Sequence, residues 1–170
     1  MIVADKIAEW LLEKGITTVF GIVGGGNVTL WDAITRLGKT QIVSTHHEQA
    51  AVMAASAYYQ VSRRVSVALV TTGAGSTNAI TGVVAAYMDS IPVLVISGNE
   101  ASKYMEAPTR VWGVQGYDSI AMVKSATKCA IRPPANECMS ALRLIHDIAI
   151  KPRQGPVWID IPKDVQNATV

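Results

Sequence analysis

Three apolar runs constrain the fold of this chain more than any other feature of its sequence. They are Val65–Thr71, Pro92–Ser97 and Pro156–Ile161. Each is nearly continuous rather than alternating, which is typical of a strand buried on both faces of a parallel sheet. Helical patterns separate these and the other apolar segments, so strands and helices alternate along the chain. The sequence therefore predicts an α/β fold: a doubly wound, mainly parallel six-stranded sheet with helices on both faces.

The remaining elements are predicted from shorter patterns. The other expected strands are Thr17–Phe20, Gln41–Thr45 and Ala126–Ile131. The expected helices are residues 3–14, 27–37 with Asn27 as the N-cap, 50–59, 76–88 with Ser76 or Thr77 as the N-cap, and 136–150. Between residues 98 and 118 no periodicity persists. A loop of that length in a compact domain is usually a functional or binding surface.

The length and hydropathy of the chain indicate one globular domain. With 170 residues, we expect a single domain over residues 1–165, with residues 166–170 as the start of a linker. Hydrophobic residues make up 49% of the sequence. No run reaches the ~18 uninterrupted apolar residues of a membrane helix, so we expect no membrane partner. The N-terminus, with Asp5 and Glu9 among its apolar residues, fits an amphipathic helix rather than a signal peptide.

Charge and cysteine content narrow the possible partners. Fifteen basic and thirteen acidic residues give a net charge of +2 without clustering, so we expect no nucleic-acid surface. Cys129 and Cys138 fit neither a disulfide framework nor a metal-ligand set, which makes a reducing cytoplasm the default location. Charged residues make up only 16% of the chain, against ~25% in a typical soluble domain. We therefore expect another domain or subunit to cover part of the surface.

Two glycine-rich stretches follow predicted strands. The first glycine turn (residues 21–27) reads Gly-Ile-Val-Gly-Gly-Gly-Asn, which lacks the spacing of the dinucleotide-binding fingerprint. The second glycine turn (residues 71–78) reads Thr-Thr-Gly-Ala-Gly-Ser-Thr-Asn, which resembles a phosphate cradle without the ending of a P-loop. Because carboxyl ends of parallel strands share one edge, both turns should lie at the ligand-binding edge of the sheet. Spacing alone is equally compatible with glycines that serve only backbone conformation or tight packing.

Glu48 is the candidate chemical centre. It follows the predicted strand Gln41–Thr45 and stands at the start of a helix rich in small residues, at the same edge as the two glycine turns. Taken alone, such a carboxylate can also be explained by the favourable helix macrodipole. His46 and His47 are adjacent, so in a strand they point to opposite faces and are not expected to share a metal.

Taken together, these stretches resemble the N-terminal, pyrimidine-binding domain of thiamine-diphosphate enzymes, most closely those of the acetolactate synthase group. The resemblance covers essentially the whole chain. The matching residues are Val19-Phe20-Gly21-Ile22-Val23-Gly24-Gly25, His47-Glu48-Gln49-Ala50-Ala51, Thr71-Thr72-Gly73-Ala74-Gly75-Ser76-Thr77-Asn78, Ala86-Tyr87-Met88-Asp89-Ser90-Ile91-Pro92-Val93 and Gly155-Pro156-Val157-Trp158-Ile159-Asp160-Ile161-Pro162-Lys163-Asp164-Val165.

The resemblance implies a cofactor site and a reaction. Thiamine diphosphate would place its aminopyrimidine against the two glycine turns, with Glu48 hydrogen-bonded to the N1′ nitrogen and activating the cofactor for attack on a small 2-oxo acid. The implied cofactor-binding residues are Val23, Gly24, Gly25, Glu48, Thr72, Gly75 and Asn78. Gln115 would lie on the substrate-side loop, and no metal ligand is expected in this chain.

The resemblance also implies a partner for this chain. Family members bind the diphosphate and Mg²⁺ through a C-terminal domain with a Gly-Asp-Gly…Asn signature, which this sequence lacks. We therefore expect either a fragment of a longer enzyme or the separate alpha subunit of a two-chain 2-oxo-acid decarboxylase, in a homodimer or larger assembly. The acetolactate synthases typically carry Phe-Gln-Glu where this chain has Val114-Gln115-Gly116, and Ala74 replaces a frequent proline. A non-catalytic nucleotide- or phosphate-binding module is the alternative of a different class.

Overall fold

The strands form one parallel sheet. The computed structural model describes residues 1–105 and 108–170. Within these residues, six strands pair in the order β2-β1-β3-β4-β6-β5, and every pair is parallel. Their bounds are β1 Thr18–Gly21, β2 Gln41–Ser44, β3 Ser66–Val70, β4 Val93–Asn99, β5 Cys129–Ile131 and β6 Val157–Pro162. The predicted doubly wound six-stranded sheet is confirmed.

The three long apolar runs form the middle of the sheet. They correspond to β3, β4 and β6, which are neighbours in the strand order and in which every residue is buried. The registers of these strands place apolar side chains side by side, for example Leu69 beside Ile96 and Ile96 beside Ile159. Burial of these strands on both faces explains why their sequences do not alternate.

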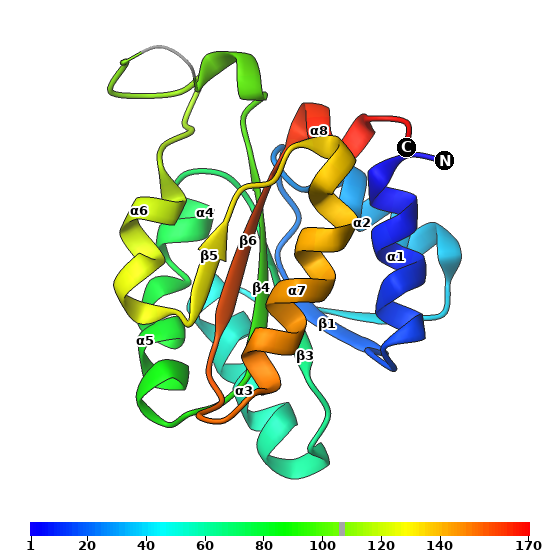
Figure 1. The fold of residues 1–170 in the computed structure, drawn as a ribbon, viewed down its shortest axis with the longest axis vertical. Helices are drawn as coiled ribbons and strands as arrows, with labels where there is room; N and C mark the ends of the chain where they lie inside the picture. Colours follow the sequence, from blue (N-terminus) through cyan, green and yellow to red (C-terminus); the bar gives the residue numbers. More distant parts are fainter. Residues whose placement is uncertain (106–107) are drawn as a thin grey trace.

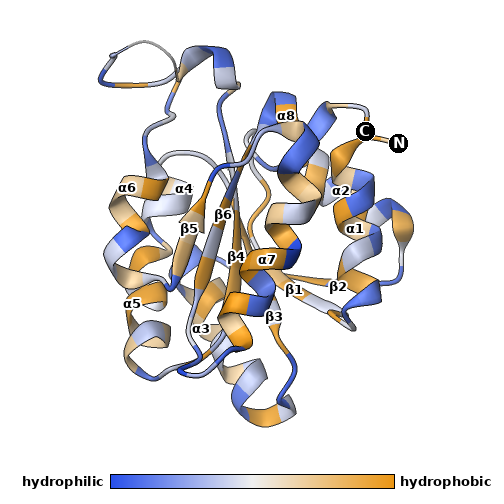
Figure 2. Cartoon of the chain, viewed as in Figure 1, coloured by the Kyte–Doolittle hydropathy of each residue, from blue (hydrophilic) through white to orange (hydrophobic). Residues whose placement is uncertain are grey.

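Helices cover both faces of the sheet (Figure 1). The helices on one face are α1 Val3–Glu13, α2 Val28–Leu37, α7 Cys138–Ile150 and α8 Lys163–Asn167. The helices on the other face are α3 Glu48–Ser62, α5 Ile80–Met88 and α6 Ser119–Val123, while α4 Ala74–Thr77 is a single turn after β3. Each face has its own apolar core, with Trp10 in one and Trp158 in the other. Figure 2 shows the apolar residues concentrated on the strands and on the helix faces toward them.

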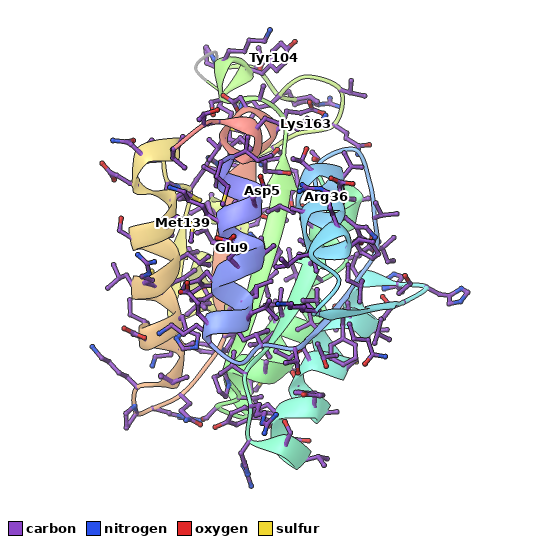
Figure 3. The ribbon with its side chains drawn as sticks, turned by 90° about the vertical axis from the view of Figure 1, so that its right-hand side faces the viewer. Asp5, Glu9, Arg36, Tyr104, Met139 and Lys163 are labelled. Atoms are coloured by element: carbon purple, nitrogen blue, oxygen red, sulfur yellow. The ribbon has the colours of Figure 1, made fainter. Side chains whose placement is uncertain are left out.

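An ion pair also joins α1 to α2 on one face of the sheet. Figure 3 shows α1 between α7 and α2, with Asp5 and Arg36 labelled on neighbouring helices. Their side chains form an ion pair at 2.7 Å. Among the residues that the structure describes, no helix combines the length and hydropathy that a membrane span requires.

Three predicted elements begin or divide at other residues in the structure, and a side-chain hydrogen bond accounts for one of these differences. The helix expected over residues 76–88 is divided into α4 and α5, and Gly73 rather than Ser76 or Thr77 precedes its first turn. The strand expected from residue 126 begins at Cys129, because Thr127 Oγ1 donates to the carbonyl of Val123 and holds a 3₁₀ turn there. A second 3₁₀ turn, Ala135–Glu137, delays α7 to Cys138.

The C-terminal tail packs against the domain. Gln166 is fully buried, and its side chain donates to the carbonyls of Gly26 at 2.6 Å and Ile161 at 2.7 Å. Val3 N donates to the carbonyl of Ala168, which brings the two termini together (Figure 1). That a linker starts at residue 166 stays a prediction, but residues 166–168 make these contacts with the domain.

The long loop after β4 is partly structured. It includes a 3₁₀ turn, Ser102–Tyr104, and an antiparallel bridge between Trp112 and Gly116. It extends beyond the carboxyl ends of the strands, at the top of Figure 1. Residues 106 and 107 of the expected loop lie outside the described residues.

Candidate functional site

The strand order reverses at β1, and the predicted site residues meet at this place. From β1 the chain passes to β2 on one side, and β3 then pairs with the other side of β1. Open α/β sheets bind ligands at such a reversal, outside the carboxyl ends of the strands. The first glycine turn follows β1, the second follows β3, and Glu48 follows β2. The sheet thus brings all three predicted stretches to one edge.

The two glycine turns are in direct contact. Gly26 N donates to Thr71 Oγ1 at 3.0 Å. A Cβ atom added at Gly24 would lie 2.6 Å from the same oxygen, and one added at Gly26 would overlap Thr72 Oγ1. Close packing between the two turns therefore requires glycine at both positions, which is one of the two explanations that their spacing allowed. Gly25 differs, because it is exposed and an added Cβ would have no atom within 4 Å.

Asn27 holds the shape of the first glycine turn. Its Oδ1 accepts from Gly24 N at 2.8 Å and its Nδ2 donates to the carbonyl of Ile22 at 3.0 Å. The side chain is fully buried and makes no capping hydrogen bond to α2. Our expectation of a side-chain N-cap was wrong, because the oxygen that would cap the helix is used within the turn.

Glu48 is the first residue of α3 and is 7% exposed. Its Oε2 accepts from Asn78 Nδ2 at 3.0 Å, so the carboxylate reaches across to the second glycine turn. The other oxygen, Oε1, lies 3.2 Å from the position of a Cβ added at Gly75. The capping of α3 is performed by His47, whose Nδ1 accepts from Gln49 N at 3.2 Å. Glu48 thus points toward the second glycine turn and does not cap its own helix.

The loop after β4 closes one side of the second glycine turn. Gln115 Nε2 donates to the carbonyl of Thr72 at 3.3 Å. The hydroxyl groups of Tyr117 and Ser76 lie 3.1 Å apart and form a hydrogen bond. Burial raises the pKa of the Tyr117 hydroxyl, an effect that the Ser76 hydrogen bond partly opposes. The loop is therefore in contact with the turn that also holds Asn78.

The structure brings most of the predicted site residues together. Glu48, Gly75 and Asn78 are in contact, the Gly24 and Thr72 turns pack on each other, and Gln115 reaches Thr72. Val23 and Gly25 lie on the exposed side of the first turn, where the Val23 side chain is 49% exposed.

Sequence reasoning missed two residues at this edge, Thr71 and Tyr117, whose side chains join separate segments. Thr71 belongs to the second glycine turn, but its contact with the first glycine turn has no sequence signal of its own. For Tyr117 the sequence offered no signal, because its partner is 41 positions away.

Comparison with known proteins agrees with this geometry. Residues 1–128 match the family described as "Thiamine pyrophosphate enzyme, N-terminal TPP binding domain". The chain is 37% identical over 165 residues to the acetolactate synthase large subunit of Haemophilus influenzae, covering 96% of this chain and 28% of that protein. It is 35% identical over 165 residues to the isozyme 3 large subunit of Escherichia coli, with 96% and 28% covered.

A solved structure gives the same fold. The X-ray structure of a putative thiamin diphosphate-dependent enzyme from Mycobacterium smegmatis superposes with a TM-score of 0.90 at 24% identity. It covers 100% of this chain, which corresponds to 32% of that protein. The chain thus spans less than a third of the length of these relatives. Because the family match covers most of the chain, this protein belongs to the thiamine pyrophosphate enzymes and carries their N-terminal TPP-binding domain, in an acetolactate synthase-like form.

Proposed function

We propose that this chain binds the pyrimidine half of thiamine diphosphate between the two glycine turns, in an enzyme that cleaves or joins small 2-oxo acids. Glu48 hydrogen-bonds the N1′ nitrogen of the pyrimidine and exchanges a proton with it. The observation that carries the proposal is the buried Glu48 carboxylate, which is held from one side by Asn78 and faces a glycine on the other.

The residues present fit the proposed group. Among the described residues, Oε1 of Glu48 forms no hydrogen bond, whereas Oε2 is occupied by Asn78. A Cβ added at Gly75 would lie 3.2 Å from Oε1 and would overlap Thr71 Cγ2, so only glycine lets the second glycine turn lie this close to the carboxylate. Exposed Gly25 permits close approach of a flat ring to the first turn. A carboxylate with one oxygen that has no hydrogen-bond partner in the described part of the protein suits a ring nitrogen that can carry a proton.

Each residue then has a limited task. Bound thiamine diphosphate supplies the electron sink for reactions of 2-oxo acids, and the protein supplies orientation and proton exchange. Glu48 holds or releases a proton at Oε1, while Asn78 fixes the rotamer of its side chain. Gly24, Gly25, Thr72 and Gly75 contact the ring, with Val23 as an apolar contact at the exposed side.

Substrate and partner complete the proposal. Gln115, whose side chain already reaches the Thr72 carbonyl, lies on the substrate side of the site. The diphosphate and Mg²⁺ are held by a separate C-terminal domain or subunit, and the enzyme is a homodimer or larger. "Complete enzyme" below means this chain together with that domain or subunit. Because Val114-Gln115-Gly116 departs from the Phe-Gln-Glu of the acetolactate synthases, the proposal names a 2-oxo-acid carboligase or decarboxylase as the class and does not name the acid.

The test is Glu48→Gln in the complete enzyme. Glutamine keeps the size of the side chain and one acceptor oxygen, but it cannot exchange a proton with the ring. Loss of general acid–base assistance typically lowers a rate by ~10²–10⁴-fold. We expect exchange of the C2 proton of bound cofactor, followed by NMR, to slow by that order, while cofactor affinity changes much less.

Glu137→Gln is the matched control. Glu137 is exposed and precedes the first residue of α7, so it shares the helix-terminal position of Glu48 without the site. A favourable macrodipole interaction is worth ~0.3–1 kcal/mol at either position. Normal C2 exchange in a folded, cofactor-loaded Glu48→Gln enzyme would reduce Glu48 to the role of Glu137 and end the proposal.

A further inference from the structure

A tight turn presents Gln115 and Tyr117 to the site. In this substrate-side turn (residues 112–118), Trp112 and Gly116 exchange two backbone hydrogen bonds of 2.8 Å. One side of the turn contacts the second glycine turn through the two hydrogen bonds made by Gln115 and Tyr117. Both hydrogen bonds are longer than 3.0 Å, and further contacts hold the turn from its other side.

The first of these contacts is made by Glu100, against which the turn packs. Glu100 is 6% exposed and its carboxylate pairs with Lys163 at 3.0 Å. A Cβ added at Gly113 or Gly116 would lie 2.9 Å or 2.8 Å from Glu100 Cγ. The turn thus packs closely on a side chain held from α8. Figure 3 shows Lys163 at the same end of the molecule as the loop that carries Tyr104.

The second anchor is Asp160, a fully buried carboxylate on β6. Its Oδ1 accepts from Ser97 Oγ at 2.6 Å, and its Oδ2 accepts from Asn99 Nδ2 at 2.8 Å. The same Asn99 amide group donates to the carbonyl of Tyr117 at 3.2 Å. Asp160 is therefore one hydrogen-bonded residue away from the backbone of the substrate-side turn.

Arg132 joins this carboxylate to the turn a second time. Its Nε donates to Asp160 Oδ2 at 2.6 Å, and its Nη2 donates to Asp118 Oδ1 at 3.2 Å. The guanidinium carbon lies 4.9 Å from the ring centroid of Trp112, in a cation–π contact. One side chain from the end of β5 thus contacts both ends of the turn and the buried carboxylate between them.

We propose that Arg132 and Asp160 are positioning residues that fix the substrate-side turn against the second glycine turn, and so determine where Gln115 stands. A buried ion pair is poor evidence for stability, since desolvation offsets much of its attraction. Its particular contribution here is geometric. Only the planar fork of arginine can donate in two directions while stacking on an aromatic ring. The role of Gln115 toward substrate rests on the proposed function; the anchoring of the turn does not.

Arg132→Lys tests the anchor in this chain. Lysine keeps the positive charge near Asp160 but cannot also reach Asp118 and stack on Trp112. Hydrogen exchange read by mass spectrometry should become roughly ten- to hundredfold faster in peptides covering residues 109–118, as expected for loss of a charge-assisted hydrogen bond. Peptides from β4 and β6 should be unchanged. Arg143→Lys, at an exposed arginine of α7 without an ion pair to any described residue, should change neither.

Kinetics of the complete enzyme test the consequence. The Arg132→Lys enzyme should show a KM for its 2-oxo acid raised by roughly tenfold, with the affinity for thiamine diphosphate within twofold of the parent. The proposal is overturned by unchanged exchange in residues 109–118, by equally faster exchange in β4 and β6, or by an unchanged KM. If instead Glu48→Gln has normal C2 exchange while Arg132→Lys still loosens the turn, the proposed function fails and the anchor stands.

Discussion

Gly25 and Gly26 are neighbours for which we predict opposite responses to alanine. At Gly26, a Cβ would overlap Thr72 Oγ1 and lie 2.9 Å from the backbone nitrogen of Thr72. The hydroxyl could rotate away, but the backbone nitrogen belongs to the segment that follows β3 and cannot. At Gly25, the added Cβ would meet no atom within 4 Å, and its φ lies outside the left-handed region.

The magnitudes follow from these distances. Overpacking of this kind costs about 1–3 kcal/mol, which we expect for Gly26→Ala. Gly25→Ala should change the free energy of unfolding little, or raise it by about 0.4–1 kcal/mol, because alanine restricts the unfolded chain. If a ring of the cofactor lies against Gly25, the same methyl group should weaken binding by about 1–3 kcal/mol, or roughly 5- to 150-fold in Kd.

Two measurements separate packing from binding. Urea unfolding of the chain, followed by circular dichroism, gives the stability of both variants. Calorimetric titration of thiamine diphosphate into the complete enzyme gives the affinity of the Gly25→Ala form. A Gly26→Ala chain as stable as the parent would refute the packing argument. A Gly25→Ala enzyme with the parent's affinity would show that the cofactor does not approach this residue.

Two further predictions concern association and alkaline stability. We expect the chain to self-associate through the surface of α3 and α5, where Met53 and Met88 are exposed. In light scattering, Met88→Glu should shift the chain toward the monomer, whereas Leu144→Glu, at an exposed residue of α7, should not. A parent chain that is a monodisperse monomer at high concentration would contradict this prediction. Burial raises the pKa of Cys138 to about 12, above that of the unfolded thiol, so the stability it contributes is complete below about pH 8.5 and is lost as pH rises toward 12. The free energy of unfolding should therefore fall less steeply above pH 9 in Cys138→Ala than in the parent, and equal slopes would refute it.

The fold could be predicted where burial alone decides structure. The runs that became β3, β4 and β6 were identified because full burial on two faces leaves a sequence with almost no polar positions. Boundaries set by a single side chain could not be predicted in the same way. The Thr127 hydroxyl holds a 3₁₀ turn where a strand was expected, and the side chain of Asn27 serves the glycine turn instead of its helix.

The candidate site could be predicted as far as sheet topology determines it. Parallel strands place the residues that follow them at one edge of the sheet, so the sequence predicts that Glu48, Gly75 and Asn78 lie near one another. The partner of each side chain was not accessible, because it depends on pairs such as Glu48 with Asn78, which are 30 positions apart. Arg132 with Asp160 is a second such pair, 28 positions apart.

Asp160 nevertheless carried a signal that sequence reasoning could have used. It is the one carboxylate within the apolar run Pro156–Ile161, and an ionised group in a fully buried strand costs several kcal/mol unless several donors surround it. Ser97, Asn99 and Arg132 all donate to it; the first two belong to the C-terminal half of β4, and Arg132 directly follows β5. This polar cluster buries no additional apolar surface, so packing of the hydrophobic core does not account for the desolvation cost of the Asp160 carboxylate. We attribute the cluster to the loop that it holds, because Asn99 donates a second hydrogen bond to Tyr117 and Arg132 donates one to Asp118. A buried charge in a predicted core strand is therefore best interpreted as an anchor for a segment outside the sheet.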